Sequence, residues 1–131
     1  MQQAETFLQL IKLIERKVEF DKQNPWYQGV ETYLSGLQNE VIEVADELKM
    51  ARRAYLEDEL ADVLWNYLNL IGQLEKQNQA SLVNVINRCL VKYQQRLDTI
   101  ENGGCWDTIK QQQKAELAKV LNDSDEQTDK E

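Results

Sequence analysis

The stretch of sequence that decides the fold is EDELADVLWNYL, residues 57–68. Its apolar residues recur every three or four positions, which is the spacing of one buried helix face; they are Leu60, Val63, Leu64, Tyr67 and Leu68. The first turn and a half of the same helix carries four carboxylates. The stretch therefore predicts a core helix whose negative charge needs a separate explanation.

The same helical spacing continues outward along most of the chain. Helices are predicted over residues 4–20, about 30–50, 55–77, 82–101 and 106–121. Pro25, in DKQNPWYQG, separates the first two helices, and the glycines of NGG, residues 102–104, end the fourth. Because no segment alternates as a strand does, the predicted fold is all-α, most simply a helix bundle.

The junction near residues 50–55 has neither glycine nor proline, so its turn is inferred from the phase of the apolar residues. One continuous helix would rotate the second apolar stripe out of line with the first by about 100°. The chain is therefore expected to turn there and form an antiparallel helical hairpin. The two stripes are Leu37, Val41, Val44, Ala45 and Leu48, then Leu56, Leu60, Val63 and Leu64.

Length and composition limit the classes of protein that the chain can represent. With 131 residues and 42% hydrophobic composition, residues 1–121 are expected to form one domain with a single core. Residues 122–131 contain five acidic residues, one lysine and no apolar residue. This acidic tail is expected to be disordered.

Several chemistries and locations are disfavoured. The chain has no histidine, the commonest metal ligand and general base, and Cys89 and Cys105 have no metal-site or disulfide spacing. The net charge of −8 argues against a nucleic-acid partner, which would be bound through Lys and Arg. Without a signal core or a membrane-length apolar run, the protein is expected to be cytoplasmic, with no membrane partner.

The carboxylates of the hairpin form a local pseudo-repeat. When residue 40 is aligned with residue 59, Glu40, Glu43 and Glu47 match Glu59, Asp62 and Asn66, and the apolar residues also fall in register. On each helix the acids lie beside the apolar stripe, on the same rotational side. If the helices pack stripe to stripe, these flanks meet on one surface and four carboxylates converge.

A solvated acidic face is the simpler explanation of such a pattern. Here, however, no Lys or Arg lies three or four residues from any of these acids, which are Glu40, Glu43, Glu47, Glu59 and Asp62. Hard oxygen ligands without a nearby thiolate suit Mg²⁺, or Mn²⁺, and Mg²⁺ commonly bridges carboxylates to substrate phosphates. Spacing alone leaves both explanations open.

These residues resemble the MazG-like, all-α nucleoside triphosphate pyrophosphohydrolases, a family related to dimeric dUTPases and phosphoribosyl-ATP pyrophosphatases. Its pattern, E-E-x-x-E and then E-x-x-D, is similar to NEVIE, residues 39–43, and ELAD, residues 59–62, with Asn39 in place of the first Glu. NPWYQ, residues 24–28, and WDTIKQQQK, residues 106–114, resemble flanking segments of the family. The resemblance implies four metal ligands: Glu40, Glu43, Glu59 and Asp62.

The resemblance also implies substrate contacts and a reaction. Lys92 and Arg96 would line a triphosphate pocket, Trp26 would contact the base, and we expect Asn66 to contact the substrate as well. The expected activity is Mg²⁺-dependent hydrolysis of nucleoside or deoxynucleoside triphosphates to monophosphate and pyrophosphate, as housecleaning of the nucleotide pool. Because histidine is absent, Glu43 or Glu47 would orient or deprotonate the water.

Alternatives remain for the aromatic residues and for the protein as a whole. Trp26 could instead plug the end of the bundle, and Trp65 could stack on a base or, as we favour, fill a subunit interface. A di-iron bundle normally requires Glu-x-x-His pairs, which this chain lacks. A non-catalytic helical module that docks basic partners is the alternative function.

The protein is expected to assemble with copies of itself. Apolar residues lie outside the main stripes, and a monomer would expose them; they include Leu10, Leu13, Trp65 and Leu68. The family resemblance likewise implies an oligomer. We expect a homotetramer built from dimers, or a dimer.

Overall fold

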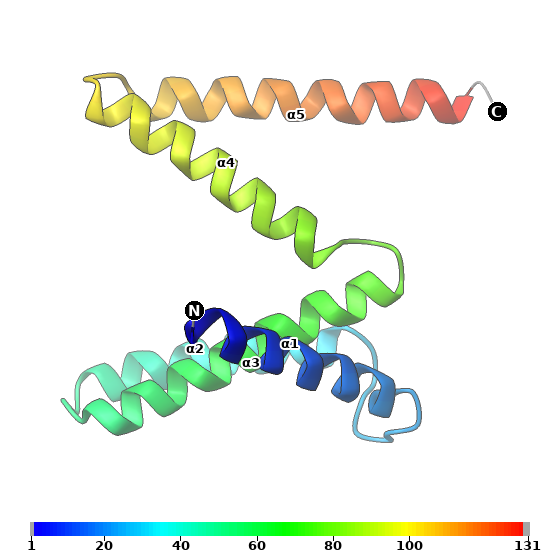
Figure 1. Cartoon of the computed structure of the whole chain (residues 1–131), viewed down its shortest axis with the longest axis vertical. Coiled ribbons are helices and arrows are strands. Elements are labelled where there is room, and N and C mark those ends of the chain that lie inside the picture. Colours follow the sequence, from blue (N-terminus) through cyan, green and yellow to red (C-terminus); the bar gives the residue numbers. More distant parts are fainter. Residues whose placement is uncertain (1, 130–131) are drawn as a thin grey trace. The chain divides into compact units, whose positions relative to one another are not determined.

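A computed structural model describes residues 2–129, with side chains described for residues 2–121, and every regular element in that range is an α-helix. The helices are α1 (Gln2–Asp21), α2 (Glu31–Leu48), α3 (Arg53–Lys76), α4 (Leu82–Glu101) and α5 (Trp106–Asp129) (Figure 1). The predicted all-α fold is confirmed. The chain divides into two compact units, Met1–Leu82 and Val83–Glu131, so the single domain expected over residues 1–121 stays a prediction.

Helix α5 is longer than the sequence pattern predicts. It continues to Asp129, into the acidic segment for which disorder is predicted. Side chains beyond Leu121 and residues 130–131 lie outside the described part, so the disorder of the tail stays a prediction. Within residues 2–129, no helix combines the length and the apolar character needed to cross a membrane.

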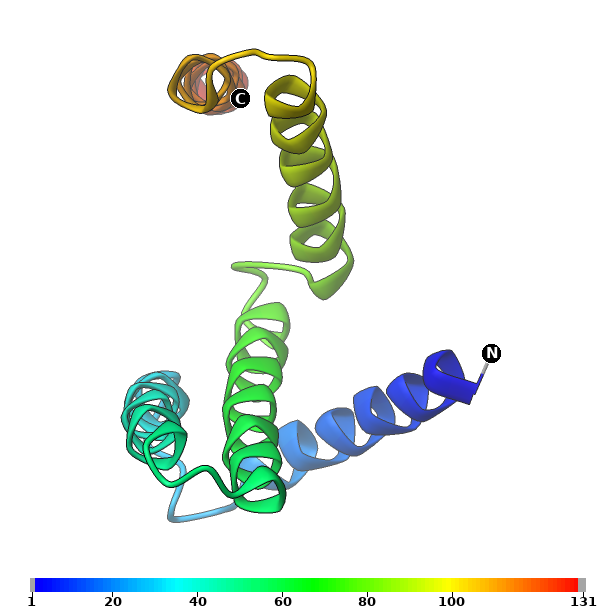
Figure 2. The same ribbon diagram turned by 90° about the vertical axis from the view of Figure 1, so that its left-hand side faces the viewer.

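In the first unit, α3 packs against both α1 and α2, and Figure 2 shows α3 between them. Ile14 of α1 and Leu68 and Ile71 of α3 are buried, each contributing about 1.5–3 kcal/mol relative to exposure. Gly72 allows the close approach of α1, because a Cβ there would lie 2.9 Å from Val18 Cγ2. These contacts fix α1 on the side of α3.

The predicted turn between α2 and α3 is confirmed, and its conformation is unusual. Ala51 adopts a left-handed φ of 55°, which costs a non-glycine residue about 1–2 kcal/mol. The next residue, Arg52, donates from Nε and Nη2 to the two carboxylate oxygens of Glu47, at 2.9 Å each, and its guanidinium lies 4.1 Å from the Tyr55 ring centroid. This bridge across the turn offsets part of the strain.

The α2–α3 hairpin is confirmed, but its predicted stripe-to-stripe packing holds only in part, since Leu37, Val44, Leu56 and Val63 are half-buried while other stripe residues are exposed. Val41 and Leu48 of α2 are 53% and 63% exposed, and Leu60 and Leu64 of α3 are 48% and 42% exposed. The helices meet closely where Gly36 faces Asn66, because a Cβ on Gly36 would lie 2.4 Å from Asn66 Oδ1. The contact is thus rotated toward the acidic flank, and much of the apolar stripe stays at the surface.

In the second unit, α4 and α5 are joined by a glycine turn. Gly103 has a φ of +81°, and the Gly104 N–H donates to the Thr99 carbonyl at 2.8 Å, so the helix end predicted from NGG is confirmed. Arg96 Nε of α4 donates to Gln113 Oε1 of α5 at 2.7 Å. The buried Ile109 completes the described core of this unit.

Candidate metal centre

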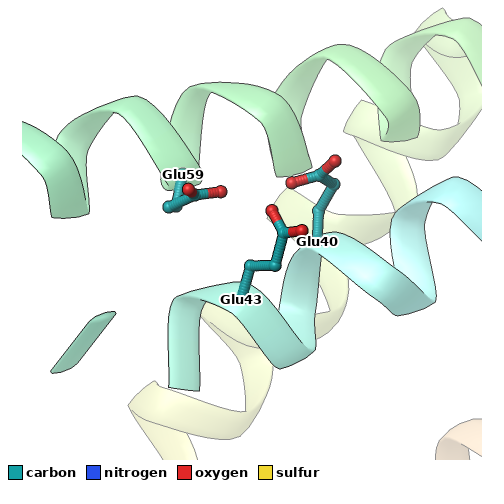
Figure 3. A group of neighbouring side chains, drawn as sticks. All are labelled: Glu40, Glu43 and Glu59. Atoms are coloured by element: carbon teal, nitrogen blue, oxygen red, sulfur yellow. The ribbon is translucent and has the colours of Figure 1, made fainter. Parts of the chain in front are cut away.

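Helices α2 and α3 bring three carboxylates together. Ligand oxygens of Glu40, Glu43 and Glu59 lie within 4.8 Å of one another. Figure 3 shows Glu40 and Glu43, from α2, directed toward Glu59, from α3. Three of the four ligands predicted from the sequence therefore share one site.

The fourth predicted ligand, Asp62, lies outside this group of three, but it is close enough for its charge to act on the carboxylates of the group. Asp62 follows Glu59 by less than one turn of α3, and its charge contributes to raising the pKa of both Glu40 and Glu59. Its backbone carbonyl accepts a hydrogen bond of 2.9 Å from the Asn66 amide. Asn66 is thereby held between this carboxylate region and Gly36.

The mutual repulsion of the cluster shifts its proton affinity. Burial, then hydrogen bonding with Glu43, then the charges of Glu43, Asp62 and Glu59 raise the pKa of Glu40 to about 7. For Glu59, hydrogen bonding with Glu43 is the largest cause of a raised pKa, followed by burial. Near neutral pH, the metal-free cluster therefore retains a proton that ordinary carboxylates would have lost.

The same carboxylates lack protein partners that would neutralise them. Oε2 of Glu40 and Oε2 of Glu59 are buried and accept no hydrogen bond within the described residues. Among the side chains of residues 2–121, no Lys or Arg forms an ion pair with any of the four predicted ligands. Buried acceptors without donors are costly, so this donor set fits a cation that the protein chain itself does not supply.

The dimensions of the cluster also suit a small divalent ion. Oxygens that bind one Mg²⁺ at about 2.1 Å lie at most about 4.2 Å apart. The three carboxylates, whose oxygens lie within 4.8 Å of one another, would need only small side-chain rotations to share such an ion. All the available donors are hard oxygens, which favours Mg²⁺ or Mn²⁺ over softer metals.

Glu47 has a different environment from the three clustered acids. The prediction that no Lys or Arg neutralises Glu47 is wrong, because Arg52 lies five residues away across the turn and donates to both of its carboxylate oxygens. The spacing of three or four residues identifies ion-pair partners only within one helix, and Arg52 lies beyond the end of α2. The side chain of Glu47 is only 12% exposed and is already paired.

Trp26, predicted to contact the base, lies in the segment between α1 and α2. The residue is 55% exposed, and its ring packs edge-on against Tyr33, with centroids 5.6 Å apart. Lys17 Nζ lies 4.6 Å from the Trp26 ring centroid. Trp26 therefore rests on the end of the bundle without being buried in it, and neither Lys17 nor Tyr33 is singled out by the sequence pattern.

The basic residues predicted to line a triphosphate pocket belong to the second unit. Lys92 is exposed, whereas Arg96 is only 5% exposed. The Arg96 guanidinium lies 5.1 Å from the Tyr93 ring centroid and 5.3 Å from that of Trp106. Arg96 thus helps to join α4 and α5, and contact of either residue with substrate phosphates stays a prediction.

The fold and the site together define an all-α protein with a candidate carboxylate metal centre on a helical hairpin. The family model of the MazG nucleotide pyrophosphohydrolase domain matches residues 28–100. This match covers more than half of the chain, which therefore belongs to the MazG nucleotide pyrophosphohydrolase family. No curated protein and no solved structure matches the chain.

The matched region includes both acidic motifs and the helix of Lys92 and Arg96. It begins after Trp26 and ends before Trp106, so the flanking segments NPWYQ and WDTIKQQQK lie largely outside it. The family assignment supports nucleotide pyrophosphohydrolase activity in general.

Proposed function

We propose that this protein hydrolyses nucleoside or deoxynucleoside triphosphates to the monophosphate and pyrophosphate, with Mg²⁺ held by Glu40, Glu43, Glu59 and Asp62. The observation that carries the proposal is the convergence of three carboxylates whose buried oxygens lack donors, on a hairpin within the matched family region. Clearance of unwanted nucleotides from the cellular pool is the task that we assign to this activity.

The four acids would hold the cation from both helices of the hairpin. When bound, Mg²⁺, or Mn²⁺ in its place, would supply positive charge that offsets the negative charge of the triphosphate as the α-phosphorus is attacked. Binding of the cation would also displace the proton that the metal-free cluster retains near neutral pH. In the first unit, Trp26 and Asn66 would contact the substrate. For Lys92 and Arg96, which belong to the second unit, we keep the expectation from the family resemblance that they contact substrate phosphates.

In the reaction, the oxygen of a water forms a bond to the α-phosphorus while the bond from that phosphorus to the bridging oxygen breaks. Pyrophosphate leaves, and a carboxylate takes the proton of the water. Glu43 is our first candidate for this role, because Arg52 already engages both oxygens of Glu47. Glu47 could act only after release from Arg52.

Two matched variants separate these roles. Glu43→Gln also removes a proposed Mg²⁺ ligand, so both variants are compared at saturating Mg²⁺ with their Mg²⁺ affinities measured. Under these conditions Glu43→Gln should lower kcat by at least about 100-fold, whereas Glu47→Gln should lower it by less than about tenfold. The larger loss in Glu47→Gln, with the affinity for Mg²⁺ unchanged, would instead make Glu47 the base.

The reaction is tested by product analysis. The purified protein is incubated with a panel of ribo- and deoxyribonucleoside triphosphates in ¹⁸O-labelled water, with Mg²⁺ or with a chelator. We expect monophosphate and pyrophosphate only with Mg²⁺, and ¹⁸O in the monophosphate, because water attacks the α-phosphorus. Diphosphate with phosphate, or ¹⁸O in the pyrophosphate, would contradict the proposed cleavage, and failure to bind Mg²⁺ would favour an interaction module.

We further propose that the protein acts as a homo-oligomer, a tetramer built from dimers or a dimer. Exposed apolar residues on α2 and α3 support this assembly, together with an open groove of about 430 Å³ that Phe7, Leu10 and Leu64 line between α1 and α3. Light scattering coupled to size exclusion should give a mass above that of one chain. Leu64→Glu should shift the protein toward the monomer, because it would bury a charge in the interface.

A further inference from the structure

A buried polar network lies at the end of the first unit, away from the carboxylate cluster. Asp21, at the end of α1, is 3% exposed. Lys17 Nζ donates to Asp21 Oδ1 at 2.6 Å and Asn24 Nδ2 donates to the same oxygen at 3.0 Å. The Tyr33 hydroxyl and Gln73 Nε2 donate to the other oxygen, Oδ2. Asp21 therefore links α1, α2 and α3.

The network extends to Trp26 by two routes. Lys17 Nζ, bound to Asp21 and to the Tyr33 hydroxyl at 2.7 Å, lies against the Trp26 ring. Asn24, bound to Asp21, accepts a hydrogen bond of 3.3 Å from the Trp26 backbone N–H. Both the ring and the backbone of Trp26 are thus held, while about half of the residue stays exposed.

The network around Asp21 and the acidic cluster use the same faces of α2 and α3. Tyr33 precedes Glu40 by seven residues on α2, so the two side chains leave the same face of the helix, about 10 Å apart along its axis. On α3, Gln73 follows Asp62 by eleven residues, which again returns to the same face. The sugar and phosphates of one nucleotide can span such a distance.

We propose that Lys17 is a positioning residue for the nucleobase: held by Asp21 and Tyr33, it fixes the Trp26 indole as a stacking surface for the base of a triphosphate bound at the carboxylate cluster. This inference rests on the proposed function for the identity of the substrate. Lys17 itself contacts the ring of Trp26 and not the reacting phosphates. Its ammonium contributes a cation–π contact, which holds the ring in one orientation before the base arrives.

Loss of this positioning should weaken the affinity for substrate, and only for substrates that carry a nucleobase. Stacking on an aromatic side chain contributes enough affinity that Trp26→Ala should raise KM for nucleoside triphosphates by about tenfold or more. Lys17→Met, which keeps most of the aliphatic stem, should raise KM by about threefold or more. Neither variant should change kcat by more than about twofold, and neither should alter KM for inorganic tripolyphosphate, which has no base.

Two further variants separate positioning from general damage to the fold. Lys17→Arg keeps a cation that can contact both Asp21 and the Trp26 ring, so it should restore KM to within about twofold of the wild type. Lys22→Met removes a lysine from the same region, but Lys22 pairs only with the exposed Glu19 at 2.8 Å among the described side chains. It should leave KM unchanged.

The experiment measures KM and kcat of the full chain with Mg²⁺ for these variants, and the binding of a non-hydrolysable triphosphate by intrinsic tryptophan fluorescence. If the wild type hydrolyses nucleotides but Trp26→Ala and Lys17→Met keep the wild-type KM, the inference is overturned and the proposed function stands. If the wild type hydrolyses no nucleotide, the proposed function fails. The inference then survives only if Trp26→Ala and Lys17→Met weaken binding of the analogue and Lys17→Arg does not.

Discussion

The two carboxylate regions of the first unit have opposite surroundings. Asp21 accepts hydrogen bonds from Lys17, Asn24, Tyr33 and Gln73. Glu40 and Glu59 instead face other acids, and each has a buried oxygen without a donor. One region is satisfied by donors within the chain, whereas in the other the described residues supply no donor to the two buried oxygens, which is what the proposed cation site calls for.

The pKa values follow this difference. Burial alone would raise the pKa of Asp21, but hydrogen bonds from Lys17, Tyr33 and Asn24 outweigh burial, and the net pKa is lowered. The pKa of Glu40 is raised to about 7, because burial and the neighbouring acids act in the same direction. A buried carboxylate with donors therefore serves the fold, whereas partly buried carboxylates without donors indicate a binding site.

The largest effect is expected from removing a predicted ligand. Glu59→Ala should lower the Mg²⁺-dependent rate by at least about 10³-fold, since a bound metal contributes several kcal/mol to the transition state. Without metal, the Glu59→Ala variant should be at least as stable as the metal-free wild type, because the variant loses one of the mutually repulsive negative charges. Steady-state rates and thermal unfolding in chelator check both statements.

The matched control is Glu57→Ala on the same helix, since Glu57 is exposed and pairs with Arg53 at 2.8 Å. It should keep the wild-type rate. An unchanged rate in Glu59→Ala would show that α3 contributes no ligand to the metal site. Asp62→Ala would then be expected to leave the rate unchanged as well.

Removal of Asp21 should have the reverse effect on stability. Asp21→Ala leaves buried donors of Lys17, Tyr33 and Gln73 without their acceptor, and should lower the free energy of unfolding by about 3 kcal/mol. Tm should fall by about 10 °C. Asp46→Ala, at an exposed position of α2, should stay within about 0.5 kcal/mol of the wild type. Equal stabilities of the two variants would contradict the structural role of Asp21.

Measuring stability with and without Mg²⁺ tests the same comparison without a mutation. Mg²⁺ at about 100 times its dissociation constant should stabilise the wild type by about 2.7 kcal/mol, because it binds the folded state. The stabilisation should vanish in Glu59→Ala and persist in Glu57→Ala. If Mg²⁺ stabilises Glu59→Ala as much as the wild type, the ion binds elsewhere.

The smallest effect is the dependence of stability on pH. The pKa of Glu40 rises from an ordinary 4.5 to about 7 on folding, so between these values the folded state binds more protons than the unfolded chain. Stability of the metal-free protein should therefore fall as pH rises from 5 to 8. Glu40→Gln should flatten this decline, and an unchanged slope would show that Glu40 does not cause it.

Asp21 should give the opposite slope in a lower range. Its pKa is lowered from an ordinary 3.8, so its contribution is present above pH 4 and is lost as pH falls through the folded value. Asp21→Asn should weaken this acid-induced loss. Chemical denaturation at each pH, with chelator present, measures both slopes.

Much of the hairpin could be predicted from local sequence. The three-to-four residue spacing in EDELADVLWNYL indicates a helix, and the change of phase near residue 50 indicates the turn that the structure has at Ala51. The pseudo-repeat predicts that Glu40, Glu43, Glu59 and Asp62 converge, because helix geometry fixes which residues share a flank. The first three of these share one site in the structure. These inferences succeed because each depends on contacts within one helix or across one turn.

Other features depend on contacts that spacing does not encode. Arg52 reaches Glu47 from beyond the helix end, and Gln73 reaches Asp21 across 52 residues. The prediction of stripe-to-stripe packing fails for Val41 and Leu60, which remain exposed. Apolar spacing shows which face of a helix is apolar, but it does not show which neighbour, if any, packs against that face.

The sequence by itself determined the all-α class, the helical hairpin and the acids that face one another, because these follow from backbone periodicity and local rotation. Only the tertiary structure decided which carboxylates are satisfied and which are not, since the donors to Asp21 come from three helices and the 22–30 segment. The difference is physical: periodicity fixes the direction of a side chain, whereas its charge and protonation depend on every group that packs around it.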